Sequence, residues 1–581
     1  MTGLLLHGGR VVTLDRGDRI AEAVAVVGDR IAAVGTCAEL AAWAGPGVTE
    51  IDLAGRTVVP GLIDGHAHLD REGLKHELPS LAGARSIDDV LEIVAGLVAR
   101  AAPGEWIVTM PLGAPPDFAG MPEGLREGRW PDRHDLDRVA PDNPVYIKSI
   151  WGYWRHTLPL VSIANTRALR LCGIGADTLP PAPTVEIVRD PASGEPTGVF
   201  VERHFMPLVE LSLMAGAPGF DVAARARALR RSMRIYNGFG TTSVFEGHGV
   251  AADVLAAFQS VREEGRQTVR ANLVYSPAWS LMGPDGSPAA VLSGWLSWLR
   301  GRGYGDDWLR LAGVYAEIDE GTDNRLRARA LPQTGWAGFH YDAGLPRGAT
   351  RELLLEAARC GVRAVGIWPN MLELFAEVDR QVPLAGRRWV FGHVSLATGD
   401  DIRRMADLGL VVTTHTNRYI WKEGEALRQR IGQTRENEIV PLRAILDAGV
   451  PVSLATDNVP PSMFPTVWHA VARQARGSGA VIAPDQRLDR MTALRAACSA
   501  GAWLSFEEAD KGSIEPGKLA DLAILSDDPL SVAEERLPTI VAERTIVGGQ
   551  VVFDRAIDAP DALKPEPFLP APVPAARGVG P

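Results

Sequence analysis

Between residues 59 and 509, short runs rich in Val and Ile alternate with stretches of helical periodicity, such as "ATRELLLEAARCG" and "TGDDIRRMADLG". This alternation is typical of a parallel sheet with crossover helices, and eight such units close into a barrel. The sequence therefore predicts an α/β fold, a (β/α)8 TIM barrel. We expect its eight strands near residues 59–66, 241–246, 271–276, 311–318, 336–341, 388–394, 410–415 and 451–457.

The two ends of the chain differ from this central pattern. Residues 1–59 and 510–556 contain Val- and Ile-rich runs separated by Gly-Gly and Gly-Asp turns, so we expect them to share a small β-sandwich. Residues 60–509 then form the catalytic barrel, and 70–220 form a cap inserted beside its mouth. The Pro- and Ala-rich tail, 557–581, is expected to be flexible.

Charge and cysteine content exclude several classes of protein. The 60 Lys and Arg against 71 Asp and Glu give a net charge of −11, which disfavours nucleic-acid binding. Four cysteines, none in a C-x-x-C pair, exclude a disulfide framework and a cysteine-based zinc site. No apolar run approaches the ~18 residues of a membrane helix, and the start lacks the pattern of a signal peptide. We therefore expect a cytoplasmic protein with no membrane partner.

Five side chains that can bind a metal stand where predicted barrel strands end. His66 and His68 lie in "GLIDGHAHLD", and residues i and i+2 of a strand point to the same side. The ends of three further predicted strands carry His340 in "WAGFHYD", His393 in "VFGHVS" and Asp457 in "LATDN". Histidine nitrogens with one carboxylate suit Zn²⁺, with Fe²⁺ or Mn²⁺ as alternatives. Barrel active sites form at this edge, so we expect a metal site there.

The motifs "GLIDGHAHL", "FGHVS", "LATDN" and "KGSIEPGKLADLAIL" together resemble the amidohydrolase superfamily. Within it, the chain is similar to the third amidohydrolase family, the branch that includes N-substituted formamide deformylase and D-aminoacylase. The resemblance covers roughly residues 3–553. It implies a metal-dependent (β/α)8 barrel with a small β-sandwich formed by both termini, in agreement with the strand pattern.

One departure from that branch bears on the metal. Its fourth barrel strand often carries a lysine whose carboxylated form bridges two ions, whereas Tyr315 stands in that place here. We therefore expect one ion per chain, with His393 behind the ligands, and leave a two-ion site open. The expected ligands are His66, His68, His340 and Asp457.

The resemblance implies hydrolysis of a non-peptide C–N bond in an amide, carbamate or urea-like small molecule, with ester hydrolysis as a further option. Asp457 would move the proton, and His393 or Tyr315 would donate a hydrogen bond to the developing oxyanion. Alternatives are a deaminase or decarboxylase on the same metal barrel, or an inactive scaffold. We expect a small-molecule substrate, with an aromatic one as an option, and five residues that bind it: Tyr315, His248, Trp151, Tyr153 and His415. Homo-oligomer formation is left open. Arg71 and Glu72 are expected to form a surface salt pair, with a position in the pocket wall as the alternative.

Overall fold

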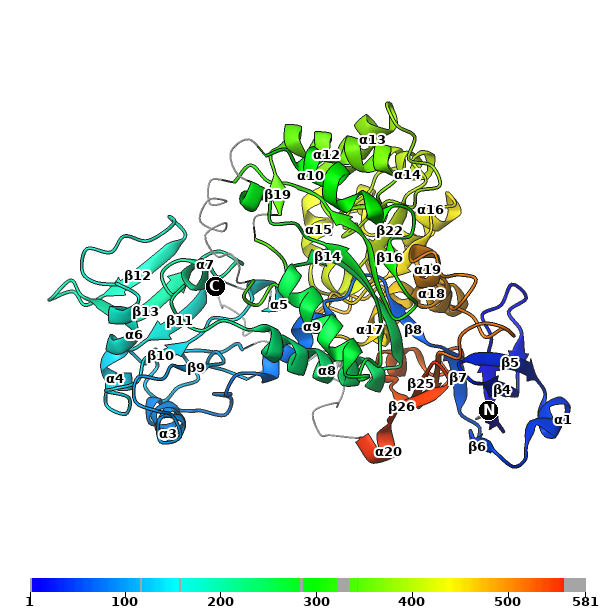
Figure 1. Ribbon diagram of the computed structural model, residues 1–581, viewed down its shortest axis with the longest axis horizontal. Helices are drawn as coiled ribbons and strands as arrows, with labels where there is room; N and C mark the ends of the chain where they lie inside the picture. The colour runs from blue at the N-terminus through cyan, green and yellow to red at the C-terminus, as the bar shows by residue number, and fades with distance from the viewer. Residues whose placement is uncertain are drawn as a thin grey trace, which may run out of the picture.

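A parallel barrel forms the centre of the molecule (Figure 1). The structure is a computed structural model that describes residues 3–114, 118–155, 158–282, 286–321, 334–341 and 343–558. Eight strands pair in chain order: β8 (Leu62–Asp64), β14 (Thr241–Val250), β15 (Arg270–Tyr275), β17 (Leu309–Tyr315), β20 (Ala364–Gly366), β21 (Val390–Phe391), β22 (Val411–Thr414) and β23 (Val452–Leu454). The Gly65 amide donates to the Leu454 carbonyl at 2.9 Å and joins the last strand to the first. The predicted fold class is confirmed.

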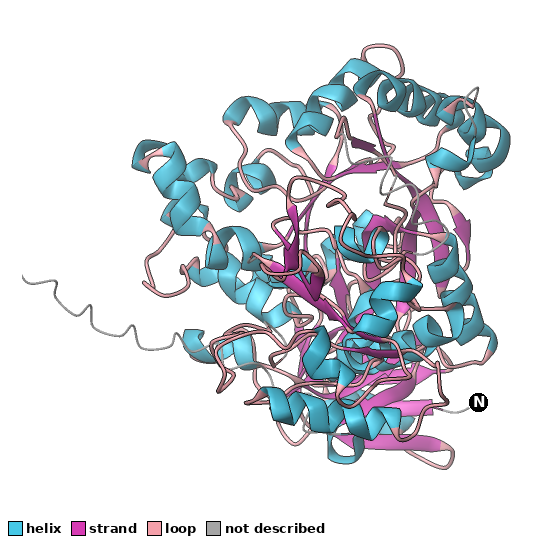
Figure 2. Cartoon of the chain, turned by 90° about the vertical axis from the view of Figure 1, so that its left-hand side faces the viewer, coloured by secondary structure: helices cyan, strands magenta, loops and turns pink. Residues whose placement is uncertain are grey.

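Helices surround these strands on the outside, as Figure 2 shows from a second direction. Their ends follow local chemistry. Thr398 and Asp401 form a capping box at the start of α14, and Gly361, with φ of 73°, ends α12 in the left-handed conformation. The longer helices around the barrel include α8 (Val222–Gly238), α9 (Ala252–Glu263), α12 (Arg347–Cys360), α13 (Pro369–Asp379), α14 (Gly399–Asp407), α17 (Met463–Ala472) and α18 (Arg490–Ala497).

The fifth barrel strand differs from the expectation. Residues 336–341 form turns and not a strand, and β20 (Ala364–Gly366) takes the fifth place between β17 and β21. The physical reason is the backbone at Gly335 and Gly338, whose φ angles of 49° and 68° interrupt an extended chain. The strand at Ala364–Gly366 is fully buried and directly follows the helix that Gly361 ends.

Both ends of the chain contribute to one β-sheet. β7 (Thr57–Pro60) pairs antiparallel with β24 (Leu522–Leu525), so residues more than four hundred positions apart become neighbours. The six-stranded sheet is completed by β2 (Arg10–Val12), β3 (Ile20–Ala21), β25 (Ala542–Val547) and β26 (Gln550–Asp554). A second sheet contains β5 (Arg30–Gly35), β4 (Ala23–Val27), β1 (Gly3–His7) and β6 (Val48–Asp52). Apolar residues of both sheets share one buried cluster.

A separate five-stranded sheet lies beside the barrel, at the left of Figure 1. Its strands are β9 (Ile107–Thr109), β10 (Val145–Ile147), β11 (Leu160–Ala164), β12 (Val185–Arg189) and β13 (Pro196–Glu202), with α3 (Ile87–Val98) packed against them. This sheet falls within the segment predicted as a cap. The domain boundaries themselves stay predictions. Of the predicted tail, only residues 557 and 558 are described, where they end α20 (Arg555–Asp558), and 559–581 lie outside the described residues.

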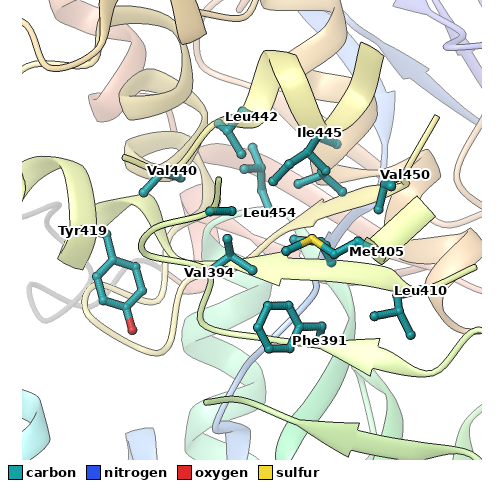
Figure 3. Close-up of a cluster of buried hydrophobic side chains, with 14 of the residues drawn as sticks. Phe391, Val394, Met405, Leu410, Tyr419, Val440, Leu442, Ile445, Val450 and Leu454 are labelled. Carbon is teal, nitrogen blue, oxygen red and sulfur yellow. The ribbon is translucent and has the colours of Figure 1, made fainter. Parts of the chain in front are cut away.

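The largest buried apolar cluster lies between the barrel strands and their outer helices. Figure 3 shows part of it, where Phe391 and Leu454 from barrel strands meet Met405 of α14 and Ile445 of α16 (Leu442–Asp447). All four side chains are almost completely buried. Burial of such a face fixes the strands and therefore the positions of the loops that follow them. Within the described ranges, no helix has both the length and the apolar character needed to cross a membrane.

Candidate metal centre

Three histidines from two barrel strands converge at the end of the barrel where the strands finish. His66 and His68 follow β8, and His393 follows β21. The Nε2 atoms of His66 and His393 lie 3.2 Å apart, and the rings of His66 and His68 stand at 90° with centroids 5.1 Å apart. All three side chains are buried. The His-x-His segment thus lies in the loop after its strand, and both rings still face one place.

Asp457 follows β23 and brings a carboxylate to the same place. Its Oδ1 atom lies 2.8 Å from Nε2 of His68 and 3.9 Å from Nε2 of His66. Its Oδ2 atom lies 3.1 Å from Nδ1 of His415, the residue that follows β22. Asp457 has a φ of 54°, and its amide donates to the His66 carbonyl at 3.0 Å, so the loops after the first and last strands hold each other.

Buried hydrogen bonds also fix the loop that carries the two histidines. The Asp64 carboxylate accepts from the amides of His66 and Thr456, at 3.2 and 3.0 Å. Oδ1 of Asn458 accepts from the His68 amide at 2.9 Å. Glu246, near the end of β14, accepts from the Leu69 amide, and its Oε2 atom lies 3.4 Å from Nδ1 of His68. Such a partner on the far nitrogen orients a ligand histidine.

The protonation states of His66, His393 and Asp457 suit metal binding, whereas burial is outweighed at His68, where hydrogen bonds to Asp457 and Glu246 raise the pKa. Burial lowers the pKa of His66 and His393 well below the usual value, and neighbouring histidines add to this effect. Their rings are therefore neutral and offer lone pairs near neutral pH. Burial alone would raise the pKa of Asp457, but the charge of His415 and hydrogen bonds from His415 and His68 hold it well below its usual range. Asp457 is therefore ionised.

These atoms fit a divalent ion. A tetrahedral zinc ion, with bonds to nitrogen or oxygen of about 2.0–2.1 Å, separates its ligand atoms by roughly 3.3 Å. The contacts of 2.8, 3.2 and 3.9 Å among His66, His68, His393 and Asp457 lie around this value, and the donor atoms of His66, His393 and Asp457 form one group, whereas His68 belongs to two neighbouring groups. Among the described residues, three groups of His, Asp and Glu donor atoms lie within 4.8 Å of one another: His66, His68 and His248; His66, His393 and Asp457; His68, Asp70 and Glu246.

His340, expected as a ligand, is in none of these groups. It was placed at the end of a strand over 336–341, and that strand does not form. Its side chain lines the adjacent cavity instead. The structure thus brings together His66, His68 and Asp457 of the expected set and places His393 beside His66.

A cavity of about 70 Å³ begins at this cluster. Trp151 and Tyr153, from the segment before β11, line it, as do His248, Phe339 and Trp368. The His248 ring stacks on Phe339 with centroids 4.4 Å apart and an angle of 6°. The walls of the cavity therefore combine aromatic rings with the edge of the histidine cluster.

Two of the expected substrate-binding residues lie behind this wall. Tyr315 is buried against the ring of His248, with centroids 4.8 Å apart, and its hydroxyl donates to Glu317 at 3.0 Å. His415 is buried behind Asp457. Neither is among the residues that line the cavity. Lys148 pairs with Glu210 at 2.7 Å within the cap segment.

Sequence reasoning missed the roles of two residues. Glu246 is completely buried beside His68, and its position two residues before His248 in one strand was an available signal. Arg71 is not on the surface: only 3% of it is exposed, and it lines the cavity. Its place three residues after His68 was visible, but its burial depends on the cap.

Comparisons with known proteins bear on the family and the fold. The family model described as "Amidohydrolase family" matches residues 49–553. An N-substituted formamide deformylase of Arthrobacter pascens is 29% identical, covering 96% of this chain and 99% of that protein. The Arabidopsis thaliana protein LONG AFTER FAR-RED 3 is 26% identical, covering 95% and 91%. The fold is similar to a metal-dependent hydrolase from Pyrococcus horikoshii, with a TM-score of 0.64, 21% identity, and coverage of 92% and 99%.

Proposed function

The chain belongs to the amidohydrolase family, and from this premise we propose that it hydrolyses a non-peptide C–N bond in a small organic molecule. One observation carries the proposal: His66, His68, His393 and Asp457 converge in a buried cluster at the mouth of the barrel. We propose that these four residues hold a single Zn²⁺, for which Fe²⁺ or Mn²⁺ could substitute. This set replaces the one expected from sequence, with His393 in place of His340.

When bound, the ion supplies Lewis acidity, which lowers the pKa of water toward about 7 and polarises a carbonyl group. Asp457 supplies proton transfer: its ionised carboxylate accepts the proton of the attacking water and passes it to the leaving nitrogen. Nδ1 of His415, 3.1 Å from Oδ2, donates to this carboxylate and keeps it oriented. Oε2 of the Glu246 carboxylate, an acceptor 3.4 Å from Nδ1 of His68, orients the His68 ring from its far side.

The substrate class is proposed from the cavity and from a relative. Trp151, Tyr153, Phe339 and Trp368 give the cavity large apolar walls, which favour an aromatic or apolar substituent. The relative named N-substituted formamide deformylase makes substituted formamides the first amides to test. Carbamates and ureas contain a comparable C–N bond next to a carbonyl group, so they are the next substrates to test. We place the enzyme in the cytoplasm, where its four free cysteines would stay reduced.

The test combines metal analysis with turnover. We expect about one equivalent of zinc or a similar ion per chain, and release of amine from at least one substituted formamide, amide, carbamate or urea. Asp457→Asn, assayed with saturating zinc, should lose roughly 10²- to 10⁴-fold in kcat. Asp400→Asn, at a surface position, is the matched control and should keep full activity.

A folded protein that binds no metal would contradict the proposal. So would an Asp457→Asn enzyme that binds metal and retains wild-type turnover. Two tightly bound ions would show that the single-ion ligand set is incomplete.

A further inference from the structure

Arg71 is a buried cation in the wall of the cavity. It belongs to the short helix α2 (Leu69–Glu72), directly after the His-x-His segment, and its side chain is 4% exposed. Within the described part of the chain, its guanidinium group donates no hydrogen bond, and its Nε atom is fully buried without an acceptor. A guanidinium group carries five N–H donors, and burying them without acceptors is unfavourable.

The surroundings hold this group in place without using its donors. Its central carbon lies 5.2 Å from the ring centroid of Phe339 and 5.9 Å from that of Trp151, which are cation–π contacts. The nearest carboxylate in an ion pair is Asp70, with Oδ1 4.0 Å from Nε, which is too long for a hydrogen bond. The ring of Trp151 comes from the cap, so cap and barrel together aim the guanidinium at the cavity.

Two other buried or cavity-lining arginines differ from Arg71 because their guanidinium groups donate hydrogen bonds. Arg225 is equally buried and donates to Asp253, Thr334 and Gly335. Arg418 lines the same cavity, but its Nε donates to Glu423 at 2.8 Å. Of the two arginines that line the cavity, Arg71 is therefore the one whose guanidinium donates no hydrogen bond within the described residues.

We propose that Arg71 binds a carboxylate carried by the substrate, so that the enzyme acts on anionic amides whose acid group lies away from the bond that is cleaved. The planar guanidinium fork matches a carboxylate with two parallel hydrogen bonds, and such charge-assisted bonds are strong in a buried site. A bound carboxylate supplies the acceptors that Arg71 lacks and neutralises its charge. The inference rests on the proposed hydrolase function and names its substrate class.

The first test measures binding to the metal-loaded full-length enzyme, without turnover. Three probes share one ring and differ in the attached group: phenylacetate, phenylacetamide and phenylphosphonate. Wild-type protein should bind phenylacetate at least 10-fold more tightly than phenylacetamide in calorimetry. Arg71→Met should remove about 10- to 100-fold of phenylacetate affinity and leave phenylacetamide affinity unchanged. Arg71→Lys keeps the positive charge but not the planar guanidinium group, so its phenylacetate affinity should lie between those of the wild-type protein and Arg71→Met. It also provides a second variant if Arg71→Met does not fold.

Arg418→Met is the matched control, since that arginine is already paired with Glu423. It should keep the preference for phenylacetate. If Arg71→Met retains this preference, the carboxylate binds elsewhere, including at the metal, and the proposal is wrong. Loss of the preference in Arg418→Met alone, or tighter binding of phenylphosphonate than of phenylacetate, would also overturn it.

The second test uses turnover of two amides that differ only in a carboxylate on the substituent. Arg71→Met should raise KM for the anionic amide about 10- to 100-fold and change KM for the neutral amide little. If wild-type enzyme prefers the neutral amide, Arg71 is not a carboxylate site although the hydrolase function holds. If wild-type enzyme cleaves neither amide nor any other tested, the hydrolase function fails, and the binding experiment still decides the role of Arg71.

Discussion

The Nε2 atoms of His66 and His393 lie 3.2 Å apart, although 327 positions separate the two residues in sequence. Closure of the barrel places the loop after β8 near the loop after β21. Because both rings are neutral and buried, their lone pairs can face a common ion.

This relationship predicts which histidine binds the metal. His393→Ala should lower zinc affinity by more than the roughly 10- to 100-fold typical for loss of a residue that only supports a ligand. His340→Ala should retain the wild-type affinity, because His340 is in none of the donor groups. Competition with a chromophoric chelator measures both. Metal loss in His340→Ala with retention in His393→Ala would restore the ligand set expected from sequence.

Gly247 should prove necessary for the position of His66. A Cβ atom at Gly247 would lie 2.5 Å from Nδ1 of His66, closer than van der Waals contact allows. Gly247→Ala should therefore shift the ring and reduce both metal content and activity. Gly96→Ala is the control, since no atom lies within 4 Å of its Cβ position. Unchanged zinc affinity in Gly247→Ala would contradict this prediction, because it would show that the His66 ring can shift without weakening metal binding.

Glu202 should make the stability of the cap depend on pH. Burial raises the pKa of Glu202 to about 8, so the folded cap binds a proton that the unfolded chain releases above about 4.5. Stability should therefore fall as pH rises from about 4.5 to about 8, by up to about 1.4 kcal/mol per pH unit, and level off above that range. Glu202→Gln should flatten this slope.

Hydrogen exchange in β13, measured between pH 5 and 9 with correction for intrinsic exchange rates, reports the stability of the cap itself. Glu186→Gln, at a partly exposed site paired with Arg203, should retain the wild-type slope. A wild-type slope in Glu202→Gln would assign the pH dependence to another group.

The buried cluster of Figure 3 predicts a large stability effect close to the metal centre. Leu454 is completely buried in β23, three residues before Asp457. Leu454→Ala removes buried methyl groups and leaves a cavity, so it should lower the free energy of unfolding by about 2–5 kcal/mol. Leu179→Ala, at a site 80% exposed, should change it by less than about 0.5 kcal/mol. Urea denaturation followed by fluorescence checks both, and equal effects would contradict the packing argument.

The sequence by itself determined the features that depend on local pattern. Strand–helix alternation and the motifs around His66, His393 and Asp457 predicted the barrel, now confirmed, and placed candidate ligands at strand ends. The β-rich runs at both termini predicted a shared sheet, and β7 pairs with β24. Each of these features extends over a few residues, so periodicity and turn residues reveal it directly.

Only the tertiary structure decided which side chains meet. The sequence placed His340 among the ligands and His393 behind them, because each ended a predicted strand, but positive φ angles at Gly335 and Gly338 remove the strand before His340. Arg71 looked like a surface residue, and it is the cap that buries it against Trp151. Convergence and burial depend on contacts between residues hundreds of positions apart, and a local pattern carries no information about those distances.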